Sequence, residues 1–559
     1  MRRAIRLFRP MDRYDYIIVG AGAAGCVLAN RLSSDPSISV LLVEAGPADR
    51  GWQIHMPAAL AYPMRNPRLN WGYQTEPQVR LDGRRINWPR GKVLGGSSSI
   101  NGMVYVRGHA LDFERWQEEG AHGWDWASIL PYFKRSESFS AGADAYRGGD
   151  GPLHVRRADG ENRLCEAWIE AGGQADYALT PDFNGYRQEG VGRLDMTVHE
   201  GRRWSAASAY LRPALKRRNL TVLTGALALR VEFDGRTARR LQVSHRRRLR
   251  ELQADREILL CGGAINSPQL LQLSGIGDAT LLKTLGIEPV ADRPQVGQNL
   301  QDHLCIYIQQ ECLTGDSLSE TLKPLAKLGV GLRWLATQTG PGSSNHFEAG
   351  GFIRTGPGVR HPDLQYHFMP LAVGYENKQT RIVPGYQVDA DALRPQSRGS
   401  VQLRSADPRD APAIDPNYLS TEADRALLRE AVRLTREIFG QAAFAPYRGR
   451  EIAPGANVRT DAEIDTYVSA TAESAYHPSC TCRMGTDTEA VVDPECRVNG
   501  VEGLRVVDAS IMPSILSGNL NGPTMMIAEK AADLILGRQA PPAEPASYFV
   551  APQWRSAQR

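Results

Sequence analysis

This chain of 559 residues lacks the sequence signatures of several classes of protein. It has no uncharged apolar run of about 18 residues, so we expect no membrane-spanning helix. It has no Gly-x-Ser-x-Gly motif, which removes the most common serine-hydrolase signature. The formal net charge is only +4, and the one basic run, His245 to Arg248, is predicted to be a solvated hairpin between two strands. We therefore expect no nucleic-acid partner.

Cysteine is also scarce, with eight residues in the whole chain. One cluster offers nitrogen and sulfur ligands close together: His477, Cys480, Cys482 and Cys496. Because a single residue separates Cys480 from Cys482, where zinc sites usually have two, we predict no metal site and reduced thiols in a cytoplasmic protein. The first ten residues have four arginines and no apolar core. They are interpreted as a dispensable extension before a second start at Met11, not as a targeting peptide.

A strand, a glycine-rich turn, a helix and a second strand are predicted near the N-terminus. An apolar run from Tyr16 to Val19 is followed by a Gly-Ala-Gly-Ala-Ala-Gly turn, and a second apolar run from Val40 to Val43 ends at Glu44. Glycines let the backbone approach a pyrophosphate at the positive end of the helix, and Glu44 is placed to accept hydrogen bonds from a ribose. The unit predicts dinucleotide binding by these residues: Gly20, Gly22, Ala23, Ala24, Gly25, Glu44 and Ala45.

Strand-like segments far apart in the sequence belong to the same kind of nucleotide-binding sheet. Arg256 to Cys261 runs into a Gly-Gly-Ala turn, and Gly503 to Ala509 includes an acid near its end. Between them, alternating runs such as Asp363 to Phe368 and a helical segment from Glu422 to Phe439 indicate a mainly antiparallel sheet with helices on one face. We predict an α/β fold with a discontinuous Rossmann-like domain (12–154, 213–310 and 471–540), an α+β substrate domain built on the antiparallel sheet (155–212 and 311–470), and tails at 1–11 and 541–559.

The last predicted helix runs from Thr524 to Leu536, after Pro523 and before Gly537. Proline favours the first turn of a helix, and glycine favours the position just past its end. We expect the N-terminus of this helix to take part in chemistry, while its apolar stripe faces the core.

Three segments carry a resemblance to a known family: Trp88–Gly108, Gly263–Gly277 and Val296–His303. They resemble the signatures of the glucose-methanol-choline (GMC) family of flavin-dependent alcohol oxidoreductases, and the match extends to the C-terminal helix. The resemblance implies that the Rossmann-like domain binds FAD. Where some members have a histidine bonded covalently to the flavin, this chain has Ile100, so we expect non-covalent, dissociable FAD.

Further FAD contacts are predicted in the same segments. Backbone amides and a hydroxyl at Gly95, Gly96 and Ser97 can surround a phosphate. The resemblance implies that residues 101–104 lie along the flavin ring, and that Asp508 and Ala509 approach its ribityl or phosphate part. The contacts predicted beyond the first glycine turn are Gly95, Gly96, Ser97, Asn101, Gly102, Met103, Val104, Gly263, Asp508, Ala509 and Thr524.

Oxidation of an alcohol needs a base that takes the hydroxyl proton. His477 begins a segment, through Gly485, that resembles the catalytic segment of the family, which makes His477 the predicted base. The family pairs this histidine with a second histidine or an asparagine just before the last helix, and counting back from Thr524 leads to Asn521. Asn521 can also be a simple helix cap, and the two roles are compatible.

The sequence indicates the substrate less specifically than it indicates the base. Ser344–Arg354 and Pro446–Ile452 resemble the choline-oxidising members of the family. This implies that Glu348 faces a quaternary ammonium, with aromatic side chains completing a cation cage. Tyr386–Pro395 departs from those members, because it carries acids in place of a histidine and small residues. Glu348 as an ordinary surface or ion-paired acid therefore stays an alternative.

The resemblance implies choline as the small-molecule substrate, betaine aldehyde as the product with glycine betaine as an open second product, and a quinone or respiratory electron acceptor. The alternatives are an aliphatic primary alcohol as substrate, oxygen as acceptor or, more remotely, a flavin-binding lyase without redox chemistry. We expect this protein to be cytoplasmic. The sequence leaves open its oligomeric state and whether it also attaches peripherally to the inner membrane.

Overall fold

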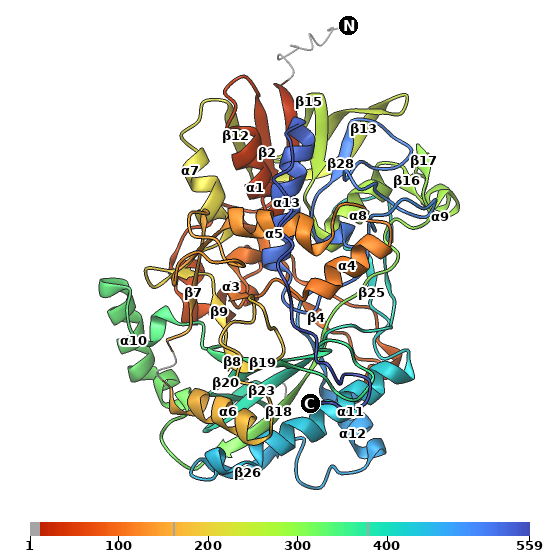
Figure 1. The fold of residues 1–559 in the computed structure, drawn as a ribbon. Coiled ribbons are helices and arrows are strands. Elements are labelled where there is room, and N and C mark those ends of the chain that lie inside the picture. The colour runs from red at the N-terminus through yellow and green to blue at the C-terminus, as the bar shows by residue number, and fades with distance from the viewer. Residues whose placement is uncertain (1–11, 160–161, 377–378) are drawn as a thin grey trace, which may run out of the picture.

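The computed structural model describes residues 12–159, 162–376 and 379–559, so the expected tail over residues 1–11 lies outside the described residues. Two large sheets occupy the two ends of the molecule (Figure 1). The upper sheet has the strands of the nucleotide-binding pattern, and the lower sheet is antiparallel. No helix in the described part of the chain is long and apolar enough to cross a membrane.

The upper sheet joins strands from three separate parts of the chain. Its strands, in order across the sheet, are β12 (Leu220–Thr224), β2 (Val40–Glu44), β1 (Asp12–Val19), β15 (Arg248–Leu260), β14 (Thr237–His245) and β13 (Ala226–Asp234). A further strand, β28 (Leu504–Val506), pairs with the end of β15. β12, β2, β1, β15 and β28 are parallel to one another, whereas β14 pairs antiparallel with both of its neighbours, β15 and β13. The nucleotide-binding sheet is therefore discontinuous in sequence.

The basic run forms the tight turn between β14 and β15, which confirms the predicted hairpin. His245 pairs with Arg248, and the two residues between them, Arg246 and Arg247, have positive φ angles of 50° and 61°. A two-residue turn with two positive φ angles matches the twist of the flanking strands. Both turn residues are exposed to solvent.

The lower sheet separates a layer of helices from the interior of the molecule. Its strands, in order across the sheet, are β26 (Arg448–Ala453), β18 (Leu304–Cys312), β23 (Gly385–Ala392), β20 (Leu364–Met369), β19 (Ala349–Ile353) and β8 (Gly190–Arg193). The helices below it are α6 (Arg163–Gln174), α11 (Glu422–Phe439) and α12 (Asp461–Thr471) (Figure 1). The bounds of α11 are those predicted.

The lower sheet also takes residues from both sides of two predicted domain boundaries. β18 begins at Leu304, before the boundary predicted after residue 310, and β27 (Glu473–Ser474), after the boundary predicted at residue 471, pairs with β18. Chain segments assigned by sequence to the nucleotide-binding domain thus extend into the sheet below.

Alternation along β20 and β23 separates apolar from polar side chains. Tyr366 and Val388 are buried in the apolar core that the sheet shares with α6 and α11. Their neighbours His367 and Asp389 line a cavity on the opposite side. Because successive side chains of a strand point to opposite faces, the lower sheet presents a polar face to the upper domain.

The last helix, α13 (Asn521–Leu536), packs against α1 (Ala23–Leu32) and α5 (Trp126–Ser136). It begins at Asn521 and not at Thr524 as predicted, because Pro523 fits the first turn, where backbone N–H groups need no helical partner. It ends at Leu536 as predicted, and Gly537, just past its end, has a left-handed conformation.

One buried carboxylate joins these three helices. Glu529 of α13 is fully buried and lies 2.7 Å from the Arg31 guanidinium of α1 and 2.9 Å from the Arg135 guanidinium of α5. It also accepts a hydrogen bond of 2.9 Å from the Tyr210 hydroxyl. Removing one member of a buried ion pair leaves charges without compensation.

We therefore expect Glu529→Gln to lower the free energy of unfolding by about 3 kcal/mol, measured as a lower urea midpoint of the holoprotein. The matched control is Glu544→Gln, because Glu544 is 40% exposed and pairs with Lys134 of the same α5. An exposed pair contributes about 1 kcal/mol or less. Equal midpoints for the two variants would contradict the role of Glu529.

Candidate active site

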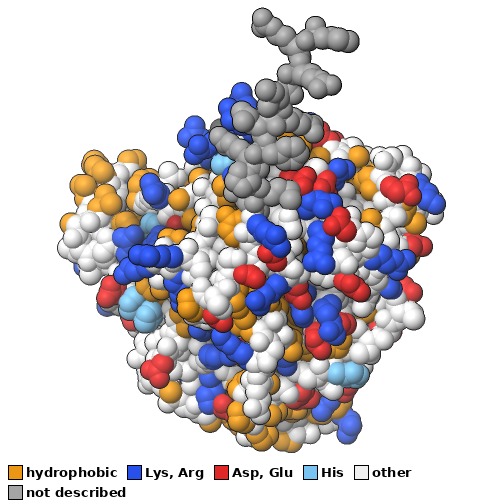
Figure 2. Space-filling model, turned by 90° about the horizontal axis from the view of Figure 1, so that it is seen from above, with side chains coloured by type: hydrophobic (Ala, Val, Ile, Leu, Met, Phe, Trp, Pro, Cys, Tyr) orange, Lys and Arg blue, Asp and Glu red, His pale blue; other side chains and the backbone are white. Residues whose placement is uncertain are grey.

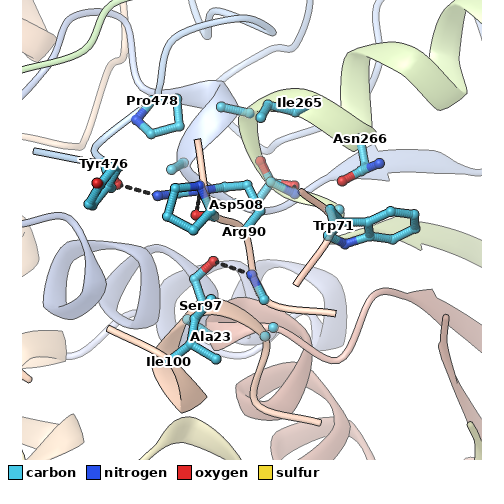
Figure 3. Close-up of a pocket in the computed structure, with 18 of the residues that line it drawn as sticks. Ala23, Trp71, Arg90, Ser97, Ile100, Ile265, Asn266, Tyr476, Pro478 and Asp508 are labelled. Carbon is cyan, nitrogen blue, oxygen red and sulfur yellow. Dashed lines mark hydrogen bonds between the residues drawn. The ribbon is translucent and has the colours of Figure 1, made fainter. Parts of the chain in front are cut away.

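A cavity of about 630 Å³ lies between the two sheets, a size typical of small-molecule and cofactor sites. Ala23, Ser97 and Ile100 lie on one side of it, and Ile265 and Asp508 lie on another (Figure 3). Most of the predicted site residues line it: Gly20, Gly22, Ala23, Ala24, Glu44, Ala45, Gly96, Ser97, Asn101, Gly102, Met103, Val104, Gly263, His477, Asp508, Ala509, Asn521 and Thr524. Three predicted residues are absent from its described wall: Gly25, Gly95 and Glu348.

Glycines shape the turn between β1 and α1. Gly20 has a φ of 103°, and a Cβ atom there would lie 2.5 Å from the carbonyl oxygen of Cys261. A Cβ atom on Gly25 would lie 1.9 Å from the carbonyl oxygen of Gly20. Gly25 therefore packs α1 against the turn, which corrects its predicted role as a direct cofactor contact. Gly22, the residue before α1, lines the cavity.

Glu44 ends β2, and its carboxylate holds the glycine turn. Its Oε2 accepts a hydrogen bond of 2.9 Å from the N–H of Ala21, and its Oε1 accepts one of 2.8 Å from Gly46. Burial raises the pKa of Glu44 to about 7, although these backbone hydrogen bonds lower it. Because each carboxylate oxygen has a second lone pair, the predicted bond to a ribose stays compatible with this arrangement.

The second glycine loop lies directly against the first. A Cβ atom on Gly96 would lie 2.7 Å from the Cα of Gly22. The N–H of Gly95 donates a hydrogen bond of 2.7 Å to the carbonyl of Ala21. Gly95 thus joins the two loops from behind, while Gly96 and Ser97 form the cavity surface. The two glycine loops therefore face the same cavity.

Residues 101–104 are held in the cavity wall by two side chains that sequence reasoning missed. Arg203 Nη1 donates a hydrogen bond of 2.7 Å to Asn101 Oδ1, and Asn345 Nδ2 donates one of 2.8 Å to the carbonyl of Gly102. Burial lowers the pKa of Arg203 to about 9. Both residues act by fixing the backbone that the resemblance places along the flavin.

The acid predicted after β28 joins two distant segments. Asp508 Oδ2 accepts hydrogen bonds from the N–H of Gly263 at 2.8 Å and from the Ser267 hydroxyl at 2.6 Å. Gly263 and Ser267 belong to α8 (Gly263–Leu273). The structure therefore brings Gly263 and Asp508 together across 245 residues of sequence, as common parts of the cavity wall.

Each of the three nitrogen atoms of His477 has a hydrogen-bond partner. Its backbone N–H donates a hydrogen bond of 2.7 Å to Asp302 Oδ1, its Nδ1 lies 3.0 Å from His303 Nδ1, and its Nε2 lies 3.1 Å from Asn519 Nδ2. Because an amide nitrogen can only donate, Nε2 of His477 is the accepting nitrogen, and its Nδ1–H donates to His303.

His477 is neutral in this environment. Burial is the largest cause that holds the pKa of His477 well below its usual value, and His303 and His367 lower it further. Arg90, which donates a hydrogen bond of 2.6 Å to the carbonyl of Tyr476 (Figure 3), acts in the same direction. A neutral imidazole with an accepting Nε2 can take a proton from an alcohol.

The asparagine that contacts His477 is Asn519 and not the predicted Asn521. Asn521 also lines the cavity, but it is the first residue of α13. Because α13 begins earlier than predicted, the chain before the helix reaches His477, and counting back from Thr524 selected the wrong asparagine for this contact. Asn519 Oδ1 accepts a hydrogen bond of 3.0 Å from Gln365.

The expected position of Glu348 is also corrected. Its Oε1 accepts a hydrogen bond of 2.5 Å from the Ser344 hydroxyl, and the carboxylate is absent from the described cavity wall. Neighbouring side chains of an extended segment point apart, so Phe347 lines the cavity and Glu348 does not. The acids that do line this part of the cavity are Asp389 and Asp391.

Strand alternation was the signal that could have identified these acids. They lie two residues apart on β23, next to the polar positions of β20, in the segment where the sequence departs from the choline-oxidising members.

No group of three or more His, Cys, Asp or Glu residues in the described ranges is arranged to hold a metal ion. The cysteines are free and buried.

Comparison with known proteins decides the family. Two profiles described as GMC oxidoreductase match, one at residues 14–305 and the other at residues 395–528. The chain belongs to the GMC oxidoreductase family. The mitochondrial choline dehydrogenase of Homo sapiens is 56% identical over 538 residues, which is 95% of this chain and 91% of that protein. The oxygen-dependent choline dehydrogenase of Brucella ovis is 51% identical over 547 residues, which is 98% of this chain and 100% of that protein.

Solved structures agree with this assignment. The pyridoxine 4-oxidase of Mesorbium loti is 33% identical, with a TM-score of 0.86 over 94% of this chain and 100% of that one. A formate oxidase variant of Aspergillus oryzae is 27% identical, with a TM-score of 0.87 over 94% of this chain and 98% of that one. This GMC oxidoreductase is an FAD-dependent enzyme, and its substrate is a small-molecule alcohol.

The residues of the cavity fit FAD. Gly22 and Gly96 present bare backbone to the cavity from two loops, where side chains would leave no room for a pyrophosphate. Residues 101–104, which the resemblance places along the flavin ring, line the same cavity as His477. The first turn of α13, with Asn521 and Thr524, also faces the cavity and has the positive end of a helix.

The predicted non-covalent linkage depends on Ile100, which lines the cavity and is buried beside Ile54 and Val93. Its side chain has no nucleophilic atom that could bond to a flavin ring. Acid or heat denaturation should therefore release essentially all FAD into the supernatant, measured by absorbance after the protein is removed. Flavin that stays with the precipitated protein would disprove this linkage.

Proposed function

We propose that this GMC oxidoreductase oxidises choline to betaine aldehyde. The observation that carries the proposal is a neutral His477 whose accepting Nε2 lies in the same cavity as the two glycine loops. Relatives that are 51–56% identical over nearly the whole chain are named choline dehydrogenases, which supports choline as the alcohol. Hydrated betaine aldehyde has the same kind of hydroxyl, so we propose it as a second substrate that is converted to glycine betaine.

The chain provides a base and an oxygen-binding group for this reaction. When bound, FAD supplies the acceptor for the hydride of the alcohol carbon. The hydroxyl of the bound alcohol takes the place of Asn519 Nδ2 at His477 Nε2, which then takes its proton, and Asn519 Nδ2 donates instead to the oxygen that becomes the carbonyl oxygen. The bond from His477 Nδ1–H to His303 keeps the imidazole oriented during the transfer.

We also propose that the enzyme is cytoplasmic, attaches peripherally to an anionic membrane and passes electrons to a quinone. The membrane attachment is supported by α10 (Pro324–Thr337), an apolar helix on which only Trp334 is buried. Four leucines of α10 are between 58% and 87% exposed: Leu325, Leu328, Leu332 and Leu335. In Figure 2, hydrophobic side chains gather at the left margin, the side on which α10 lies in Figure 1.

Charge favours a lipid partner for this surface over a second copy of the chain. α10 carries Lys327 and Arg333 and has no acidic residue. Two copies of α10 packed together would bring like charges close, whereas anionic lipids complement them. Lys327 Nζ lies 5.1 Å from the ring centre of Tyr62 in α3 (Ala61–Arg65), and Met64 of α3 lines the cavity. The lipid-facing surface thus adjoins the cavity wall.

Oxygen is the second candidate acceptor, because the Brucella relatives are named oxygen-dependent. Reoxidation of the reduced enzyme by a quinone analogue, compared with reoxidation by oxygen alone, distinguishes the two acceptors.

The catalytic assignment predicts a graded set of losses. His477→Ala should keep bound FAD but slow flavin reduction by an anaerobic alcohol at least about a hundredfold, since it removes the base. Asn519→Ala should slow reduction more than the matched variant Asn521→Ala, because only Asn519 contacts His477. Because the pKa of His477 is lowered, the wild-type rate at saturating neutral alcohol should not fall as the pH drops from 7 to 6. Near wild-type reduction by His477→Ala would remove His477 from the mechanism.

The membrane assignment predicts that replacing Leu328 and Leu332 together by Glu weakens binding to vesicles with anionic lipids at least about tenfold, because both side chains lose lipid contact and the new charges are repelled. Flotation with the vesicles measures the effect. The control is Leu179→Glu, because Leu179 is 60% exposed and lies outside α10. Unchanged flotation of the double variant would contradict the proposal that α10 binds lipid. A double variant that still floats with the vesicles but no longer forms a dimer would show that α10 pairs with a second copy of the chain.

A further inference from the structure

The lower sheet presents two acids to the cavity from the middle of its polar face. Asp389 and Asp391 occupy alternate positions of β23 and both line the cavity. In the register of the sheet, Asp389 lies opposite His367 of β20 and opposite Tyr307 of β18. Residues that lie directly opposite on one face of an antiparallel pair are side-chain neighbours. Asp389 is therefore flanked by His367 and by the second acid.

Negative charge exceeds positive charge in this group. Asp391 is 1% exposed, and its Oδ2 lies 3.0 Å from His367 Nδ1. Neither oxygen of Asp391 accepts any further hydrogen bond from the described residues. Asp389 Oδ1 accepts a hydrogen bond of 3.0 Å from Gln387. Asp391 contacts the one imidazole directly and Asp389 lies opposite it in the sheet, so when both acids are ionised the group has one negative charge in excess for a ligand to neutralise.

The acids lie next to the base through a short chain of contacts. His367 Nε2 is 3.4 Å from Asn519 Oδ1, and Asn519 Nδ2 is 3.1 Å from His477 Nε2. Phe347, which also lines the cavity, lies edge-on to His367 with ring centres 5.9 Å apart. A small alcohol held at His477 therefore has an acidic and aromatic wall within reach of its other end.

We propose that Asp389, backed by Asp391 and His367, forms the subsite for the cationic group of the substrate and so selects alcohols that carry a positive charge. This inference rests on the proposed oxidation of a cationic alcohol, and it assigns the role expected of Glu348 to a different strand. Glu348 is bonded to Ser344 and lies outside the described cavity wall.

The subsite makes cation binding depend on pH. Burial, and then the charge of Asp391, raise the pKa of Asp389 to about 7, while His367 lowers it. Although burial lowers the pKa of His367, the Asp391 carboxylate raises it above its usual value overall. The other titratable groups that line the cavity around this face are Tyr307 and Cys305 of β18. Those elsewhere in the wall are Glu44, Tyr73, Arg90, Lys92, Cys261, Arg409, Asp410, Tyr476, His477 and Asp508.

The direction of the pH effect follows from the charge of Asp389. A bound cation favours the ionised carboxylate, so affinity for a cation should rise as the pH rises through 7. A neutral alcohol of the same shape lacks this interaction and should show no corresponding rise.

The test compares choline with its neutral isostere 3,3-dimethylbutan-1-ol. In the wild-type holoenzyme, the ratio of kcat/KM for the two alcohols should rise about tenfold between about pH 6 and pH 8, the change in the ionised fraction around a pKa of about 7. Asp389→Asn should lower the ratio at pH 8 by roughly 30-fold or more and abolish its pH dependence. Asp389→Glu retains the charge and should restore much of the ratio.

Glu348→Gln is the matched control, and its ratio should stay within about threefold of the wild type, since an exposed or rim charge contributes little. Bound flavin is measured for every variant to identify misfolding. A larger loss for Glu348→Gln than for Asp389→Asn, or an Asp389→Asn enzyme that keeps both the ratio and its pH dependence, overturns the inference.

A second measurement separates this inference from the proposed function. Tetramethylammonium should inhibit oxidation of 3,3-dimethylbutan-1-ol competitively in the wild type, and at least about tenfold less strongly in Asp389→Asn. If choline is not oxidised but this inhibition depends on Asp389, the proposed substrate is wrong and the cation subsite stands. If inhibition is equal in the two proteins, the subsite is wrong even where choline is oxidised.

Discussion

Close approach of bare backbone is the constraint on which the rest of this structure depends. Two loops that are distant in the sequence meet here: a Cβ atom on Gly20 of the first would lie 2.5 Å from the carbonyl oxygen of Cys261, and one on Gly96 of the second would lie 2.7 Å from the Cα of Gly22. Gly95 adds a direct backbone hydrogen bond between the two loops. At this end the cavity is thus formed where main chains meet without side chains, and the phosphate site proposed there would depend on backbone N–H groups.

The catalytic end of the cavity depends on buried polar groups in place of glycines. Asp302 holds the backbone N–H of His477 and also accepts hydrogen bonds from the hydroxyls of Ser474 and Tyr418. Burial raises the pKa of Asp302 to about 6, although these bonds lower it. The loop that carries His477 is therefore fixed by a carboxylate one residue before His303, so both histidines are positioned together.

Local patterns were predictable from the sequence, and contacts across the cavity were not. The glycine turn, α11 and the hairpin at His245 depend on neighbouring residues, so the sequence predicts them well. Asn519 was missed because two asparagines lie close together before α13, and only the helix start decides which one reaches His477. Asp389 was noted only as a departure, since its neighbours on β18 and β20 are distant in sequence.

Because β28 and α13 belong to the upper domain, the order of synthesis decides when the cavity can be completed. β1 and the glycine turn leave the ribosome first, yet Asp508, Asn519 and Thr524, which complete the cavity, are made last. At roughly 5–20 residues per second, the first wall of the cavity waits tens of seconds for its counterpart. An N-terminal fragment has neither the closing strand nor the closing helix, so the complete cavity can form only near the end of translation.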